Sequence, residues 1–170
     1  PSEVTIDATT EKVSDKYYDT NGDYDVQWTG GSDVNFDRFD LYENGVLVYS
    51  GSGTSYSVSG KADGTYVYKA VAVDKAGWTT SSEEITVVVD TQAPVITLIG
   101  QKAWPPLGWS FEITVSDSGS GIDKIWYDKG IFDGVMCTDS GCLVIGGVDQ
   151  VTVYARDKAG NENTLVVNKG

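Results

Sequence analysis

Apolar and polar residues alternate along most of the chain with a period of two, which is the period of a β-strand with one buried face. Val4, Ile6 and Ala8 begin the pattern, with polar residues between them. The alternation recurs at residues 24–28, 39–41, 46–49, 56–58, 66–72 and 85–89. About seven strands therefore fall within residues 1–90, which is the strand count of a β-sandwich domain.

Asn44 and Gly45 separate two of these predicted strands. Asn-Gly is the strongest short-range signal for a two-residue β-hairpin, because both residues adopt positive φ at low cost. We therefore expect a tight hairpin between residues 39–41 and 46–49.

The alternation stops at residues 90–94, where Pro94 suits the entry to an edge strand because it has no N–H to donate. It resumes at residues 95–99, 111–115, 125–127, 134–137, 142–145, 151–155 and 165–167. Both halves contain the tetrapeptide DKAG, which begins at Asp74 and again at Asp157. We therefore predict an all-β fold of two antiparallel β-sandwich domains in tandem, at residues 1–90 and 91–170, with a short linker.

Several segments resemble known extracellular modules. The first half resembles a fibronectin type III domain, with Trp28 in the place of the strand-B tryptophan and Tyr66 in the tyrosine-corner position. The second half resembles the immunoglobulin-like repeats of bacterial surface proteins, in DTQAP, ITVSDSGSGIDKIWY and VYARDKAGNEN. The resemblance implies immunoglobulin-like sandwiches that serve as spacers, adhesive arms or appendages of secreted hydrolases, outside the cell or at its surface.

The charged residues of the chain limit which partners it can bind and which catalytic sites it can form. The chain has 12 basic and 25 acidic residues, a formal net charge of −13, and no His. Such a surface repels phosphate backbones and anionic membranes, so nucleic acid is not an expected partner. No apolar run reaches the roughly 18 residues of a membrane-spanning helix. Without His, a Ser-His-Asp or Cys-His site is impossible, and we expect no enzyme activity.

Cys137 and Cys142 are the two cysteines of the chain. A zinc site would need further Cys or His ligands, so a local disulfide across a hairpin turn is the better interpretation. Asp139 and Gly141 suit that turn. A disulfide in turn favours an oxidising compartment.

Residues 19–23 follow the D-x-N-x-D start of a calcium loop. The full loop needs Gly at its sixth position and a carboxylate at its twelfth, whereas this chain has Tyr24 and Gly30 there. A polar turn between the first two strands is therefore favoured.

A second acidic group is predicted from the sandwich topology, at the junction of the two domains. The linker contributes Asp90, the loop after the second strand of the second domain contributes Asp117, and the DKAG turn contributes Asp157. Asp63 and Asn161 are further candidates. Calcium prefers such an all-oxygen set, and related adhesin repeats often bind it at domain junctions. Alternatively, these side chains accept backbone N–H bonds that shape the turns.

Trp104 and Trp109 flank two prolines in the segment AWPPLGW, which we expect to be the loop between the first two strands of the second domain. Aromatic rings exposed on a stiff loop could stack on a sugar or on a partner protein. The alternative is that both rings fold back and cap the edge of the sandwich.

The leading functional hypothesis is a non-enzymatic, monomeric structural and adhesive segment of a larger extracellular or cell-surface protein. Its partners are the neighbouring domains of the same polypeptide and a cell-surface glycan or protein. The alternative hypothesis is a carbohydrate-binding module, or accessory domains of a secreted glycoside hydrolase.

Overall fold

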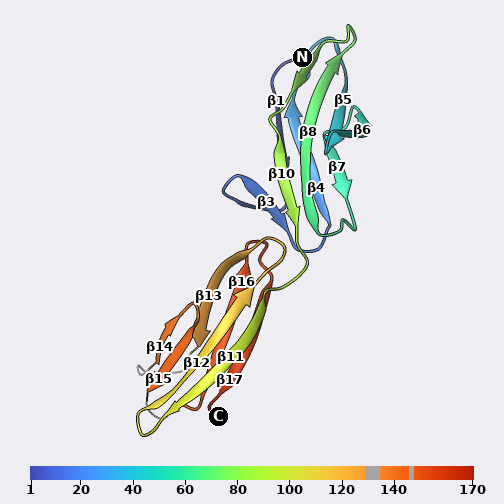
Figure 1. The fold of residues 1–170 in the computed structure, drawn as a ribbon. Coiled ribbons are helices and arrows are strands. Elements are labelled where there is room, and N and C mark those ends of the chain that lie inside the picture. The colour runs from blue at the N-terminus through green and yellow to red at the C-terminus, as the bar shows by residue number, and fades with distance from the viewer. Residues whose placement is uncertain (129–134, 146–147) are drawn as a thin grey trace. The chain divides into compact units, whose positions relative to one another are not determined.

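The chain folds into two compact units, Pro1–Thr91 and Gln92–Gly170, in a computed structural model (Figure 1). The structure describes residues 1–128, 135–145 and 148–170. Every regular element in these ranges is a β-strand, which confirms the prediction of an all-β fold. The described residues include no helix long and apolar enough to cross a membrane.

The first unit pairs a small sheet with a large one. The small sheet has the order β1-β4-β7, with β1 (Val4–Ala8), β4 (Tyr24–Gly30) and β7 (Ser55–Val58). The large sheet has the order β2-β3-β10-β8-β5-β6, and β9 pairs with β8. Its strands are β2 (Glu11–Val13), β3 (Lys16–Asp19), β5 (Phe36–Glu43), β6 (Val46–Gly51), β8 (Gly64–Asp74), β9 (Thr79–Ser81) and β10 (Ile85–Val89).

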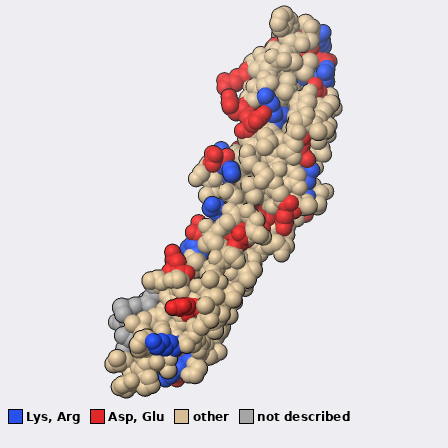
Figure 2. Space-filling model, in the orientation of Figure 1, with Lys and Arg blue, Asp and Glu red and all other residues tan. Residues whose placement is uncertain are grey.

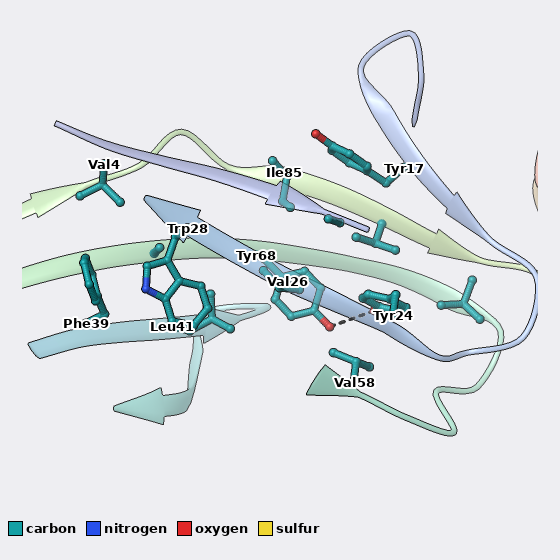
Figure 3. Packing of buried hydrophobic residues seen from close by; sticks show 14 of the residues in the cluster. Val4, Tyr17, Tyr24, Val26, Trp28, Phe39, Leu41, Val58, Tyr68 and Ile85 are labelled. Carbon is teal, nitrogen blue, oxygen red and sulfur yellow. Dashed lines mark hydrogen bonds between the residues drawn. The ribbon is translucent and has the colours of Figure 1, made fainter. Parts of the chain in front are cut away.

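The core of the first unit closes around Trp28, whose side chain is 1% exposed (Figure 3). Its ring packs against the rings of Phe39, at 6.0 Å between centroids, and Tyr49, at 5.4 Å. The inward row of β8 supplies the opposite wall, including Tyr68 and Ala70. The alternating positions of the sequence therefore form the core, as one-sided burial of a strand requires.

The predicted Asn-Gly hairpin is confirmed. Asn44 and Gly45 have φ angles of 49° and 80°, and the register places Glu43 opposite Val46. The tyrosine corner is present as well, because the hydroxyl of Tyr66 donates to the carbonyl of Ala62 at 2.9 Å.

One part of the first unit departs from the prediction. The segment between β1 and β4, expected to be a simple turn, contains the β2–β3 hairpin, which lies along the edge of the large sheet. β3 pairs with β10 in parallel, from Lys16 opposite Thr86 to Asp19 opposite Val89, so this sandwich is not wholly antiparallel. The pairing satisfies the backbone edge that β10 would otherwise leave open.

The described residues of the second unit form seven strands in two antiparallel sheets. One sheet has the order β11-β12-β15-β14 and the other β13-β16-β17. This is the ABED and CFG order of a constant-type immunoglobulin sandwich. The strands are β11 (Val95–Trp104), β12 (Gly108–Ser116), β13 (Ile122–Asp128), β14 (Val135–Thr138), β15 (Gly141–Ile145), β16 (Gln150–Asp157) and β17 (Glu162–Asn168).

The first hairpin of the second unit is longer than predicted. β11 continues to Trp104 and β12 begins at Gly108, so the connection is only residues 105–107, and the expected loop at 103–109 is wrong. The predicted strand at 134–137 is seen from Val135 onward, and residue 134 lies outside the described residues.

A buried hydrogen-bonded network crosses the first core. The hydroxyls of Tyr24 and Tyr68 are 2.9 Å apart, and Tyr68 donates to Glu43 Oε2 at 2.8 Å. Lys61 Nζ donates to the other oxygen of Glu43 at 2.6 Å. Burial raises the pKa of Tyr24 to about 12, and burial together with the bonds to Tyr24 and Glu43 raises the pKa of Tyr68 further.

We predict that the first unit loses stability as the pH rises from 10 towards 12. A tyrosine whose pKa is raised in the folded state stabilises the fold below its unfolded pKa, near 10, and loses this contribution as the pH approaches the folded value. For Tyr24 the full loss is roughly 3 kcal/mol. Denaturant unfolding followed by circular dichroism between pH 8 and 11.5 measures it.

Tyr24→Phe should flatten this pH dependence, whereas Tyr56→Phe, outside the network, should leave it unchanged. Equal slopes for the original chain and Tyr24→Phe would contradict the assignment.

Candidate functional site

Asp157 ends β16 and is buried, with 1% of its surface exposed. It continues the inward row of that strand, so a carboxylate occupies a position where an apolar side chain would otherwise lie. Its Oδ1 accepts the backbone N–H of Gly160 at 2.7 Å and of Asn161 at 2.9 Å. Its Oδ2 accepts the side-chain amide of Asn161 at 2.9 Å. These bonds compensate for the burial of the charge.

Asp117 lies directly after β12 and organises the neighbouring loop. Its Oδ2 accepts the backbone N–H of Gly119 at 3.0 Å and of Gly121 at 2.6 Å. The loop is joined to the DKAG turn, because the N–H of Lys158 donates to the carbonyl of Gly121 at 3.0 Å. The two acidic turns of the second unit are therefore held side by side.

Asp117 and Asp157 each present an oxygen, and these oxygens lie within 4.8 Å of each other. At an effective dielectric constant near 20, two such charges repel by about 3 kcal/mol. The ion pairs found in the described part of the chain include neither carboxylate. Two neighbouring oxygens with an adjacent amide are the kind of ligands that calcium accepts.

Asn161, Asp63 and Asp90 are the remaining predicted ligands. Asn161 lies beside Asp157, through the bonds described above. Asp63 belongs to the first unit, where its Oδ1 accepts the N–H of Thr91 at 2.9 Å. Asp90 also belongs to the first unit, directly after β10, and is buried. The participation of Asp63 and Asp90 in a shared cation site stays a prediction.

The first unit contains the same DKAG turn. Asp74 Oδ1 accepts the N–H groups of Ala76 and Trp78, each at 2.9 Å, and Gly77 adopts a φ of 85°. The turn-shaping role that we considered as the alternative is therefore present in both copies. In the second unit, Asp157 also has the carboxylate of Asp117 within 4.8 Å.

The turn at residues 19–23 has the polar character expected of it. Asp19 Oδ1 accepts the N–H groups of Asn21 at 3.1 Å and Gly22 at 2.5 Å. Asn21 Oδ1 in turn accepts the N–H of Asp23 at 2.7 Å. Asp19 thus serves the local turn, whereas Asp23 Oδ1 accepts the N–H of Gly60, far along the chain, at 2.8 Å.

The two predicted sugar-binding tryptophans have different environments. Trp109 is 2% exposed, packs on Phe111 at 5.6 Å between ring centroids, and donates from Nε1 to the carbonyl of Val148 at 2.8 Å. It is a core residue, so the prediction that it contacts a ligand is wrong. Trp104 is 43% exposed at the end of β11.

Trp104 is held by residues that the sequence analysis did not single out. Lys102 Nζ lies 4.2 Å from the centroid of its ring, and its Nε1 donates to Ser110 Oγ at 3.1 Å. The alternation of β12 could have revealed Ser110, because it lies between the inward residues Trp109 and Phe111. The two prolines predicted a loop up to residue 109, so the alternation of inward and outward side chains was expected to begin only at Phe111.

Cys137 and Cys142 are directly opposite each other in the register of β14 and β15. Opposed strand positions bring Cβ atoms close enough for a disulfide. The side chain of Cys137 lies outside the described residues, and the bond stays a prediction.

Comparison with known proteins supports the fold. No protein-family model matches the chain, and no curated protein sequence matches it. A solved structure of the fibronectin(III)-like modules of Clostridium thermocellum CbhA is similar, with 21% identity, a TM-score of 0.54, and coverage of 98% of this chain and 93% of that one. At this identity the likeness shows the fold alone. The extracellular domains 3–5 of Drosophila OTK align at 11% identity over 100% of this chain and 65% of that chain, and their TM-score of 0.37 carries no argument.

We predict that the unreduced chain has no free thiol. Alkylation of the denatured, unreduced protein should add no mass, whereas alkylation after reduction should add two adducts. The bond closes a short loop, so its loss should cost only about 2 kcal/mol and should loosen the β14–β15 hairpin more than the fold. Two adducts without reduction would contradict the pairing.

Proposed function

We propose that the chain is a non-enzymatic extracellular segment that connects neighbouring parts of a larger surface or secreted protein and holds them at a defined separation. The observation that supports this most directly is the anchoring of the connecting residues. Only residues 90–94 separate the end of β10 from the start of β11.

On its first side, the connection is bonded to the turns of the first unit. The N–H of Asp90 donates to the carbonyl of Asp19 at 2.9 Å, and the N–H of Thr91 donates to Asp63 Oδ1 at 2.9 Å. Both bonds fix the backbone up to the last residue of the unit. A flexible linker rich in Gly and Ser would leave such groups to water.

On its second side, the connection is bonded to the second unit. Asn161 Nδ2 donates to the carbonyl of Gln92 at 3.3 Å, and Asn163 Nδ2 donates to the carbonyl of Pro94 at 2.8 Å. Proline further restricts the backbone at the entry to β11. A connection fixed on both sides suits a spacer, and it suits equally an accessory segment of a secreted glycoside hydrolase.

The surface charge supports a solvent-exposed, monomeric role. Acidic side chains are distributed over the displayed faces of both units, with basic ones between them (Figure 2). A net charge of −13 favours solubility and opposes binding to nucleic acid or anionic membranes. The predicted disulfide is in keeping with an extracellular location.

We further propose that calcium binds to the acidic turns, with Asp117 and Asp157 as the principal ligands. A cation there would remove the repulsion between the two carboxylates. Asn161 completes the set within the second unit, and Asp90 and Asp63 are the candidates from the first. Calcium at this position would stabilise the turns through which the connecting residues are anchored.

The spacer proposal predicts that the two units tumble together. ¹⁵N relaxation should give one rotational correlation time for both, because a stiff spacer would restrict their independent reorientation. Insertion of four Gly-Ser residues between Ala93 and Pro94 is the control and should give each unit its own, shorter correlation time. If the original chain already shows two separate correlation times, the units move independently and the proposal fails.

The calcium proposal predicts a rise in melting temperature of about 5 °C when calcium exceeds its dissociation constant tenfold, because only the folded state binds it. Asp117→Asn and Asp157→Asn should abolish the rise. Asp74→Asn is the matched control, since Asp74 shapes the same DKAG turn in the first unit, and it should retain the rise. Asp90→Asn tests whether the first unit contributes a ligand.

Calorimetric titration of chelator-treated protein supplies the second measurement. Absence of both binding heat and a melting shift would leave turn formation as the role of these carboxylates.

A further inference from the structure

The outer face of the β11-β12-β15-β14 sheet carries a groove whose role the connecting function does not explain. Three adjoining hollows of about 350, 200 and 380 Å³ follow β12. The first and second share Trp104, the second and third share Leu143, and the first and third share Ser110 and Glu112. The three hollows therefore adjoin one another along β12, and we refer to them together as the groove.

The groove exists because the outward residues along its centre are small. Trp109 and Phe111 point into the core, so Gly108 and Ser110 lie on the outer face of β12. The register places Lys102 on one side of Ser110 and Leu143 on the other. The larger side chains of Lys102 and Leu143 therefore form the two sides of the groove, and Ser110 lies at its floor.

Trp104 forms a fixed aromatic wall of this groove. The ring is held by Lys102 and by the bond from Nε1 to Ser110. Beside it, Leu107 and Leu143 line the apolar end of the depression, and both are exposed. Exposed apolar side chains that lie together are a usual mark of a binding surface.

Among the described residues, the rest of the lining is polar and has no net charge. Lys102 and Glu112 contribute one charge of each sign, and Ser110, Thr138 and Ser140 contribute hydroxyl groups. This local neutrality contrasts with the net charge of −13 for the whole chain. A ligand that suits this lining has an apolar face for the aromatic ring, hydroxyl groups for the polar end, and no net charge.

We propose that this groove binds a neutral oligosaccharide, with one sugar ring against Trp104 and Leu107 and the next along Ser110 and Glu112. The carbon face of a pyranose packs on an aromatic ring, while its hydroxyls bond to side chains such as carboxylate and hydroxyl. From Gly108 to Glu112 the strand extends about 13 Å, which accommodates a short oligosaccharide. The inference is independent of the connecting role and of calcium.

The test is a ¹⁵N NMR titration of the full chain with cellohexaose, xylohexaose and mannohexaose. At least one should shift the indole N–H of Trp104 and the amides of Ser110 and Glu112. Hexagalacturonate, of the same length but acidic, should bind at least about tenfold more weakly, because the protein repels it.

Two tryptophan variants distinguish binding in the groove from unspecific binding elsewhere on the protein. Trp104→Ala should weaken binding at least about tenfold, since a central aromatic contact is lost. Trp78→Ala is the matched control, because Trp78 is 74% exposed in the other unit, and it should bind as the original chain does.

Gly100→Leu tests the groove while leaving Trp104 in place. A Cβ at Gly100 would meet nothing within 4 Å, so the larger side chain fits the fold and fills the depression. It should abolish binding with little change in melting temperature. The proposal is overturned if no neutral oligosaccharide shifts the groove resonances, if Gly100→Leu binds normally, or if the surface takes only a protein partner.

Discussion

Successive side chains of a strand point to opposite faces, so burying one row of a strand fixes the direction of the other. This constraint determines where the polar chemistry of the molecule lies. In β12, burial of Trp109 and Phe111 turns Ser110 and Glu112 outward into the groove. In β16, the buried row continues to Asp157 and places a carboxylate under the turn, where backbone N–H groups must satisfy it. Both candidate sites therefore depend on how the core is packed.

A strand with one buried face can be predicted from the sequence, and so can a turn whose shape depends only on adjacent residues. The Asn44-Gly45 hairpin and the Tyr66 corner were predictable, because each depends on a few adjacent residues. The β2–β3 hairpin was not, since the side chains of β2 are exposed and the partner of β3 is β10, far along the chain. Trp109 was misplaced although it continues the inward phase of β12, because two prolines suggested a loop.

The two DKAG turns show what local sequence leaves open. Oδ1 of Asp74 and Oδ1 of Asp157 each accept the backbone N–H of the residue four positions later, and the two turns make the same backbone–backbone bonds. The loop that packs beside each turn decides which groups surround its carboxylate. Asp117 reaches Asp157 through a loop joined by the bond from Lys158 to Gly121. The pairing is a tertiary property, so the acidic residues could be proposed as a group from topology, but their distances could not.

The packing of the second unit also fixes the position of the exposed Trp104 ring before any ligand binds. Binding an oligosaccharide requires that the protein lose little conformational freedom, because each side chain ordered on binding reduces the affinity. Lys102 and Ser110 already hold the ring, and both lie on strands of a hydrogen-bonded sheet. A tryptophan of similar exposure on a mobile loop would have to be ordered by its ligand. A preorganised ring therefore lets a shallow groove, with few contacts for its ligand, retain useful affinity.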